Sequence, residues 1–106
     1  MNALRARTLP NGLTLFEATT PAARRRGLGG LRDLPPGTAL LLEPCRSVHT
    51  LTMRFTLDLV WLDGAGRVVR IDEGVPPRRV RTCLRARSVV EARAGEGARF
   101  AASMAR

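Results

Sequence analysis

An apolar run of six residues, Leu57 to Leu62 (L-D-L-V-W-L), constrains the fold of this chain more than any other stretch. Both alternate sets of positions in the run are mostly apolar, which predicts a central β-strand covered on both faces. The turn sequence Asp63-Gly64-Ala65-Gly66 follows, and Arg67 to Ile71 then offers a partner strand. We therefore expect a central hairpin, with Trp61 in the core.

A second hairpin is predicted near the start of the chain. Asn11-Gly12 lies between Leu4–Thr8 and Leu13–Ala18, and Asn-Gly favours a tight hairpin turn because both residues accept positive φ. Thr38 to Glu43 and Ala86 to Ala92 are short runs that stop at Pro or Gly, and we interpret both as strands.

Two segments between these strands have a weaker pattern. Val48 to Met53 fits either a strand or a loop, since it is rich in Thr. Asp72 to Arg81 is predicted to be a loop, because Gly74, Pro76 and Pro77 interrupt any regular period.

Two helices are also expected. Thr20 is a suitable N-cap and Pro21 a suitable first residue, so a helix should run to Arg26 and end at the following glycines. Residues Arg24-Arg25-Arg26 would point in different directions at about 100° per residue, which argues against one tight basic face. Ala98 to Arg106 fits a short C-terminal helix.

These elements predict an α+β fold in one domain, residues 1–106. The expected architecture is a compact, mainly antiparallel sheet or a small barrel-like sheet. One short helix follows the first hairpin, and a short C-terminal helix is optional. A chain of 106 residues suits a single domain with one modest core.

The charge of the chain is strongly positive. It contains 18 arginines and no lysine against nine acidic residues, a formal net charge of +9. A solvated arginine surface is the simplest interpretation. Non-specific binding of nucleic acid is an alternative, for which the candidate phosphate contacts are Arg24, Arg25, Arg78, Arg79 and Arg81. Against it, only four residues are aromatic, and they lie in apolar segments rather than on a stacking surface.

The sequence favours a cytoplasmic protein with reduced thiols. It contains two cysteines, too few for a disulfide framework. No basic start followed by an apolar signal region is seen. No stretch approaches the roughly 18 apolar residues of a membrane span.

The segment from residue 45 to residue 58 carries the residue types suited to a binding site. Two thiols and an imidazole could bind zinc, with Asp58 or water as fourth ligand, although the spacing lacks a paired C-x-x-C. No other cofactor is predicted. The candidate ligand-binding residues are Cys45, His49, Met53, Arg54, Asp58 and Cys83, and the candidate metal ligands are Cys45, His49 and Cys83.

Other interpretations of these residues stay open. A Cys45–Cys83 disulfide would close a loop of roughly 40 residues and add about 3–4 kcal/mol, but a reducing cytosol opposes it. A cysteine activated by His49 would need an oxyanion site, for which no motif is present. Two half-buried free thiols are the simplest reading, and Met53 is more often a core residue than a copper ligand.

Asp58 interrupts the apolar strand and needs hydrogen bonds if it is buried. Its partner is expected to be His49, Arg54 or backbone N–H groups. A role in organising the local backbone is favoured over a role as general base. A buried Trp61 needs an acceptor for its indole N–H.

Four segments, in order, resemble the bacterial and archaeal family called domain of unknown function 192. Their counterparts in the family are T-P-x-E-R-x-x-G-L-M, G-M-L-F, P-L-D-I-L-F-L-D-x-D-G-R-I-V and V-L-E-L-x-A-G. The segments in this chain are residues 20–28, 36–42, 57–69 and 88–95.

This chain also departs from the family pattern. Val48 to Met53 replaces the common F-W-M-K-N-T signature, and His49-Thr50-x-x-Met53-Arg54-Phe55 resembles a subset of relatives. The usual C-terminal G-x-x-x-G-D strand is missing, which predicts an open sheet edge able to support a dimer. The resemblance implies an α+β fold dominated by antiparallel strands and no established activity.

We therefore predict a small binding or accessory module, leaning away from an enzyme. Its partner would be an unknown small ligand or protein, bound near Cys45 to Arg54. Nucleic-acid binding through arginine and a metal or thiol site are the alternatives.

Overall fold

The computed structural model of the chain describes residues 4–29 and 31–104. Its main element is a six-stranded sheet built from β1 (Arg5–Thr8), β2 (Thr14–Ala18), β3 (Thr38–Leu42), β5 (Leu57–Leu62), β6 (Val68–Val75) and β8 (Ser88–Arg93). A two-stranded ribbon pairs β4 (Ser47–His49) with β7 (Val80–Thr82). The helices are α1 (Pro21–Arg26), α2 (Gly97–Met104) and a 3-10 turn at Pro10–Gly12. The predicted α+β class is confirmed.

The strand order of the large sheet is β1-β2-β3-β8-β5-β6. Every neighbouring pair is antiparallel except β2 and β3, which are parallel and are connected through α1. The sheet does not close, so the barrel-like alternative is not the one adopted, and β1 and β6 form its edges.

Strand β5 lies inside the sheet, between β8 and β6, and all six of its residues are buried. Its side chains alternate between two apolar clusters. Leu59 and Trp61 belong to one, and Val60 and Leu62 to the other. The prediction of a strand covered on both faces is therefore confirmed.

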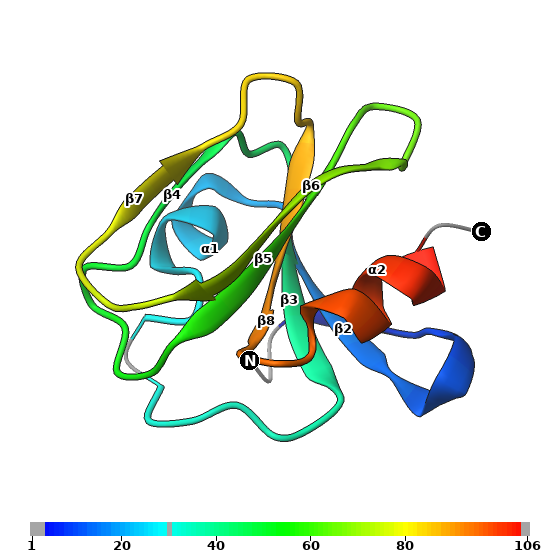
Figure 1. Ribbon diagram of the computed structural model, residues 1–106, viewed down its shortest axis with the longest axis horizontal. Coiled ribbons are helices and arrows are strands. Elements are labelled where there is room, and N and C mark those ends of the chain that lie inside the picture. Colours follow the sequence, from blue (N-terminus) through cyan, green and yellow to red (C-terminus); the bar gives the residue numbers. More distant parts are fainter. Residues whose placement is uncertain (1–3, 30, 105–106) are drawn as a thin grey trace.

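Different elements cover the two faces of the sheet. Figure 1 shows α1 and the β4–β7 ribbon on one side and α2 on the other. Leu28, which follows α1, and Val48 of β4 pack into the first cluster. Phe100 of α2 fills the second. The two sides of one sheet therefore have separate cores.

The local signals for the first hairpin and the first helix are confirmed. Asn11 and Gly12 have φ of 67° and 74° in the turn between β1 and β2. The Thr20 side chain accepts a hydrogen bond from the Ala23 N–H at 3.1 Å, as an N-cap should. Gly27 ends α1 with a φ of 53°, in the region that favours glycine.

The predicted loop from Asp72 to Arg81 is wrong at both ends. Strand β6 continues to Val75, and β7 begins at Val80. Gly74 stays beside β5 because its N–H donates to the Asp58 carboxylate at 2.9 Å, next to a register shift in the β5–β6 pairing. Only the segment with the two prolines leaves the strands.

Val48 to Met53, for which strand and loop were both considered, contains both: β4 ends at His49 and a turn follows. The C-terminal helix is confirmed as far as Met104; the predicted residues 105 and 106 lie outside the described part of the chain.

The Trp61 indole donates to Asp72 at 3.0 Å, which supplies the expected acceptor. Among the described residues, no helix has the length and apolar character needed to cross a membrane.

Candidate functional site

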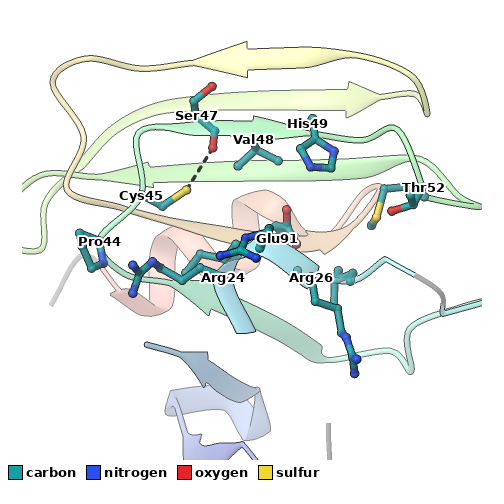
Figure 2. Close-up of a pocket in the computed structure, with 14 residues that line it drawn as sticks. Arg24, Arg26, Pro44, Cys45, Ser47, Val48, His49, Thr52 and Glu91 are labelled. Atoms are coloured by element: carbon teal, nitrogen blue, oxygen red, sulfur yellow. Dashed lines mark hydrogen bonds between the residues drawn. The ribbon is translucent and has the colours of Figure 1, made fainter. Parts of the chain in front are cut away.

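A cavity of about 260 Å³ lies between the end of α1 and strand β4, on the α1 side of the sheet. Its volume is slightly below the range for small-molecule pockets, about 300–1,000 Å³. In Figure 2, Glu91 lies between the arginines of α1 and the residues of β4. Apolar side chains from several elements form much of the wall, namely Leu28, Leu42, Val48 and Met53.

Glu91 comes from the middle of β8, where its neighbours across the sheet are Leu40 and Leu59. Strand alternation puts its side chain on the same face as Val89, toward α1. The residue is only 3% exposed. Among the described residues, nothing donates a hydrogen bond to its Oε1 atom. Glu91 is therefore a buried acid at this cavity, and one of its carboxylate oxygens has no donor among the described residues.

Burial raises the pKa of Glu91 to about 7, because the low-dielectric surroundings disfavour the charged form. The backbone N–H of Leu28 partly opposes this rise. Gly27 leaves room for the carboxylate, since a Cβ at that position would lie 3.0 Å from Oε1. The end of α1 thus encloses the acid, and the Leu28 N–H that follows the helix is the group that favours its charged form.

Three arginines of α1 line the same cavity. The Nη1 atom of Arg24 donates to the Thr19 carbonyl at 2.6 Å, and this side chain is half-buried. Arg25 and Arg26 are exposed. Arg24 and Arg26 extend in different directions (Figure 2), in agreement with the prediction that the three do not form one tight face.

Cys45 and His49 lie on the opposite side of the cavity from the arginines. The Cys45 thiol donates to the Ser47 carbonyl at 3.2 Å. Burial raises the pKa of this thiol and the nearby Glu91 charge adds to the rise, while a backbone hydrogen bond from Ser47 to the sulfur and the charge of Arg24 lower it. His49 is exposed, so it forms part of the rim.

The structure separates the six candidate ligand-binding residues into two groups. Cys45, His49 and Met53 line the cavity, while Arg54, Asp58 and Cys83 do not. Arg54 is exposed. Cys83 is buried in the apolar cluster on the α1 side of the sheet.

The structure supports neither the zinc site nor the disulfide considered for Cys45 and Cys83. Within residues 4–29 and 31–104, no three His, Cys, Asp or Glu side chains are placed to hold a metal ion, so Cys45, His49 and Cys83 do not form the zinc cluster considered above. The disulfide alternative is wrong, since Cys45 and Cys83 are both free.

Asp58 faces the other side of the sheet and belongs to the fold. Its carboxylate accepts hydrogen bonds of 2.9 Å each from the backbone N–H groups of Gly74, Gly95 and Gly97. It therefore connects β6 to the start of α2. Of the partners expected for Asp58, the backbone groups are the ones found.

The five arginines considered as phosphate contacts also fall into two groups. Arg24 and Arg25 line the cavity; Arg78, Arg79 and Arg81 do not. The Arg79 N–H donates to the Thr50 hydroxyl at 2.8 Å, and the Arg81 guanidinium donates to the Val80 carbonyl at 3.0 Å. Polyanion binding by these residues stays a prediction.

Sequence reasoning missed Glu91 as a site residue. Its segment, S-V-V-E-A, predicts a strand and carries part of the family resemblance, but Glu91 was not among the candidate site residues. The missed signal was the one that singled out Asp58, a carboxylate inside an otherwise apolar strand.

Comparison with solved structures identifies similar folds. A putative transcription regulator from Sinorhizobium meliloti has a TM-score of 0.76 and 21% identity, over 94% of this chain and 86% of that one. A protein of unknown function from Novosphingobium aromaticivorans has a TM-score of 0.73 and 18% identity, over 92% and 87%. At these identities the likeness concerns the fold alone.

No curated protein matches this chain. The model of a family described as uncharacterized, DUF192, matches residues 5–103 and so spans nearly all of the sequence. This match agrees with the resemblance of the four ordered segments. The chain belongs to the DUF192 family.

Proposed function

We propose that this protein is a non-enzymatic binding domain for a small molecule, which enters the cavity between α1 and β4 and donates a hydrogen bond to Glu91. The observation that carries the proposal is the placement of Glu91, a buried acid that lines the cavity and whose Oε1 atom has no donor among the described residues.

Glu91 and Asp58 differ in the hydrogen-bond donors that the fold supplies to them. A buried acceptor left without a partner costs about 1–3 kcal/mol. Asp58 avoids that cost through three backbone donors. A ligand with an amine, guanidinium or amide N–H would remove the cost at Glu91. A charged donor would also favour the ionised form of the acid.

The chemistry of Cys45 supports binding rather than nucleophilic catalysis. A catalytic cysteine reacts as the thiolate and is usually found with a lowered pKa. Here burial and the Glu91 charge raise the pKa of the thiol, so it stays protonated near neutral pH. Cys45 then acts as a small wall residue beside the acid.

The test is NMR titration of isotopically labelled protein with pentylamine, pentylguanidine and pentanamide at about pH 8.5. The pKa of Glu91 is about 7, so the carboxylate is mostly ionised under these conditions. We expect at least one probe to shift the amide signals of Gly27, Leu28 and Val48 in a saturable way.

Two variants make the result specific. Glu91→Gln keeps the shape of the side chain and removes its charge, and we expect its affinity for the amine to fall about tenfold or more. Glu43→Gln removes the same charge from an exposed residue outside the cavity and should bind as the wild type does. Equal affinity in the wild type and Glu91→Gln, or no binding of any probe, would reject the proposal.

A further inference from the structure

We infer that the ligand is amphoteric, with a cationic N–H group at Glu91 and an anionic carboxylate or phosphate at Arg24 and Arg25, joined by a short apolar segment. This inference rests on the proposed function and adds the chemical class of the ligand. It follows from the distribution of charge and apolar surface within the cavity.

The arginines supply the positive side. Four ion pairs occur within the described residues, and none of them involves Arg24, Arg25 or Arg26. Helix α1 itself contains no acidic residue. Guanidinium groups without a carboxylate partner at a cavity are suited to recognising an anion.

Arg24 is the arginine best placed for this role. It is half-buried, and its contact with the Thr19 carbonyl at 2.6 Å restricts the side chain. A restricted guanidinium loses less conformational entropy on binding than a free one. Arg24 and Cys45 line the same cavity, and the Arg24 charge lowers the pKa of the Cys45 thiol.

The cavity wall also contains apolar side chains. Val48 and Met53 are buried wall residues, and Leu28 and Leu42 line the same cavity. A methylene chain between the two charges of a ligand would contact this apolar surface. An ω-amino acid has such a chain, whereas an α-amino acid carries both charges on one carbon.

The experiment compares three probes that share a five-carbon chain: 5-aminopentanoate, pentylamine and pentanoate. We expect 5-aminopentanoate to bind the wild type about tenfold more tightly than pentylamine, the gain of one charge-assisted contact. Pentanoate should bind most weakly, because its apolar end cannot donate to Glu91.

Arginine variants locate the anionic contact. In Arg24→Gln the preference for 5-aminopentanoate over pentylamine should fall several-fold, toward one. Arg25→Gln should reduce it independently, which keeps the test valid if Arg24→Gln folds poorly. Arg67→Gln, which changes an exposed arginine in the turn between β5 and β6, should retain the full preference. Because the measured quantity is a ratio between two probes, a uniform loss of affinity cancels.

The outcomes separate the two proposals. If pentylamine binds the wild type as tightly as 5-aminopentanoate and depends on Glu91, the amphoteric ligand is refuted while the proposed function stands. If pentanoate binds as tightly as 5-aminopentanoate, the donor at Glu91 is unnecessary and both are refuted. Unchanged preference in both Arg24→Gln and Arg25→Gln would refute the anionic contact.

Discussion

Replacing Glu91 with Gln should remove a defined part of the pH dependence of folding stability. The substitution conserves the size of the side chain and leaves a neutral group in the same buried position. The wild-type acid is 3% exposed and titrates with a pKa of about 7, because burial disfavours its charge. A glutamine has no such titration, so the two proteins should differ in stability by an amount that depends on pH.

The sign follows from proton binding. Between the ordinary glutamate pKa of 4.5 and the folded value of about 7, the folded protein holds a proton that the unfolded chain has released. The free energy of unfolding therefore falls as the pH rises through this interval. At about 1.36 kcal/mol per pKa unit, the loss is about 3 kcal/mol. It is absent below about pH 4.5 and complete above about pH 7.

Urea unfolding at a series of pH values measures this effect. Trp61 is the single tryptophan and is fully buried, so its fluorescence should report the transition. The stability of Glu91→Gln relative to wild type should increase by about 3 kcal/mol between about pH 4.5 and pH 8.5. The difference in free energy of unfolding between the two proteins at each pH cancels most of the contribution from the titration of other groups. Glu43→Gln should follow the wild type across the range.

A difference between Glu91→Gln and wild type that stays constant with pH would refute the reasoning. It would mean that Glu91 titrates in the folded protein as it does in the unfolded chain. That result would remove the desolvated acid on which the binding proposal depends. A difference of the opposite sign would mean that a donor stabilises the ionised carboxylate in the folded protein.

Two further predictions concern other residues. Asp58→Asn should lower the free energy of unfolding by about 2–4 kcal/mol, since three backbone N–H groups lose a charged acceptor. In the same urea assay Asp33→Asn, at an exposed position, should change the free energy of unfolding by less than about 0.5 kcal/mol. Equal effects of the two substitutions would contradict the structural role of Asp58. At about pH 8, Cys45 should react with iodoacetamide more slowly in the folded protein than in the unfolded chain, because burial raises the pKa of its thiol. Glu91→Gln should speed the reaction, because it removes a negative charge that raises the pKa of the thiol further. Mass spectrometry of the alkylated peptide measures this rate, and a rate unaffected by Glu91→Gln would contradict the coupling between the two groups.

Much of the fold was predictable because local chemistry determined it. The positive φ of Asn11 and Gly12 shapes the first turn, and the Thr20 cap starts α1. The continuous apolar character of Leu57 to Leu62 predicted a buried interior strand. In each case the signal is contained within a few neighbouring residues.

The errors have a common physical cause, which is pairing between segments far apart in the sequence. Strand β7 has little strand character of its own, and it forms because β4 pairs with it, with Val48 opposite Arg81. Gly74 would weaken an isolated strand, but its N–H is held by the Asp58 carboxylate. The parallel pairing of β2 with β3 likewise depends on how the chain returns through α1.

The candidate site was only partly predictable from the sequence, because it too depends on segments far apart in the sequence. The sequence drew attention to Cys45, His49 and Met53, which do line the cavity. It also grouped them with Cys83, which lies in the core. The arrangement of α1 over β8 decides which residues share the cavity, and no spacing within one segment encodes it.

The two buried acids of the sheet show what separates a structural carboxylate from a candidate binding carboxylate. Both Asp58 and Glu91 interrupt apolar strands, and they lie on opposite faces of the sheet. The start of α2 and Gly74 bring three N–H groups to Asp58, so the fold satisfies that acid. The end of α1 directs little more than the Leu28 N–H at Glu91, since the exposed backbone groups at a helix C-terminus are mainly carbonyls. The polarity of the neighbouring helix therefore leaves Glu91 short of donors, and a ligand with an N–H group is suited to supply one.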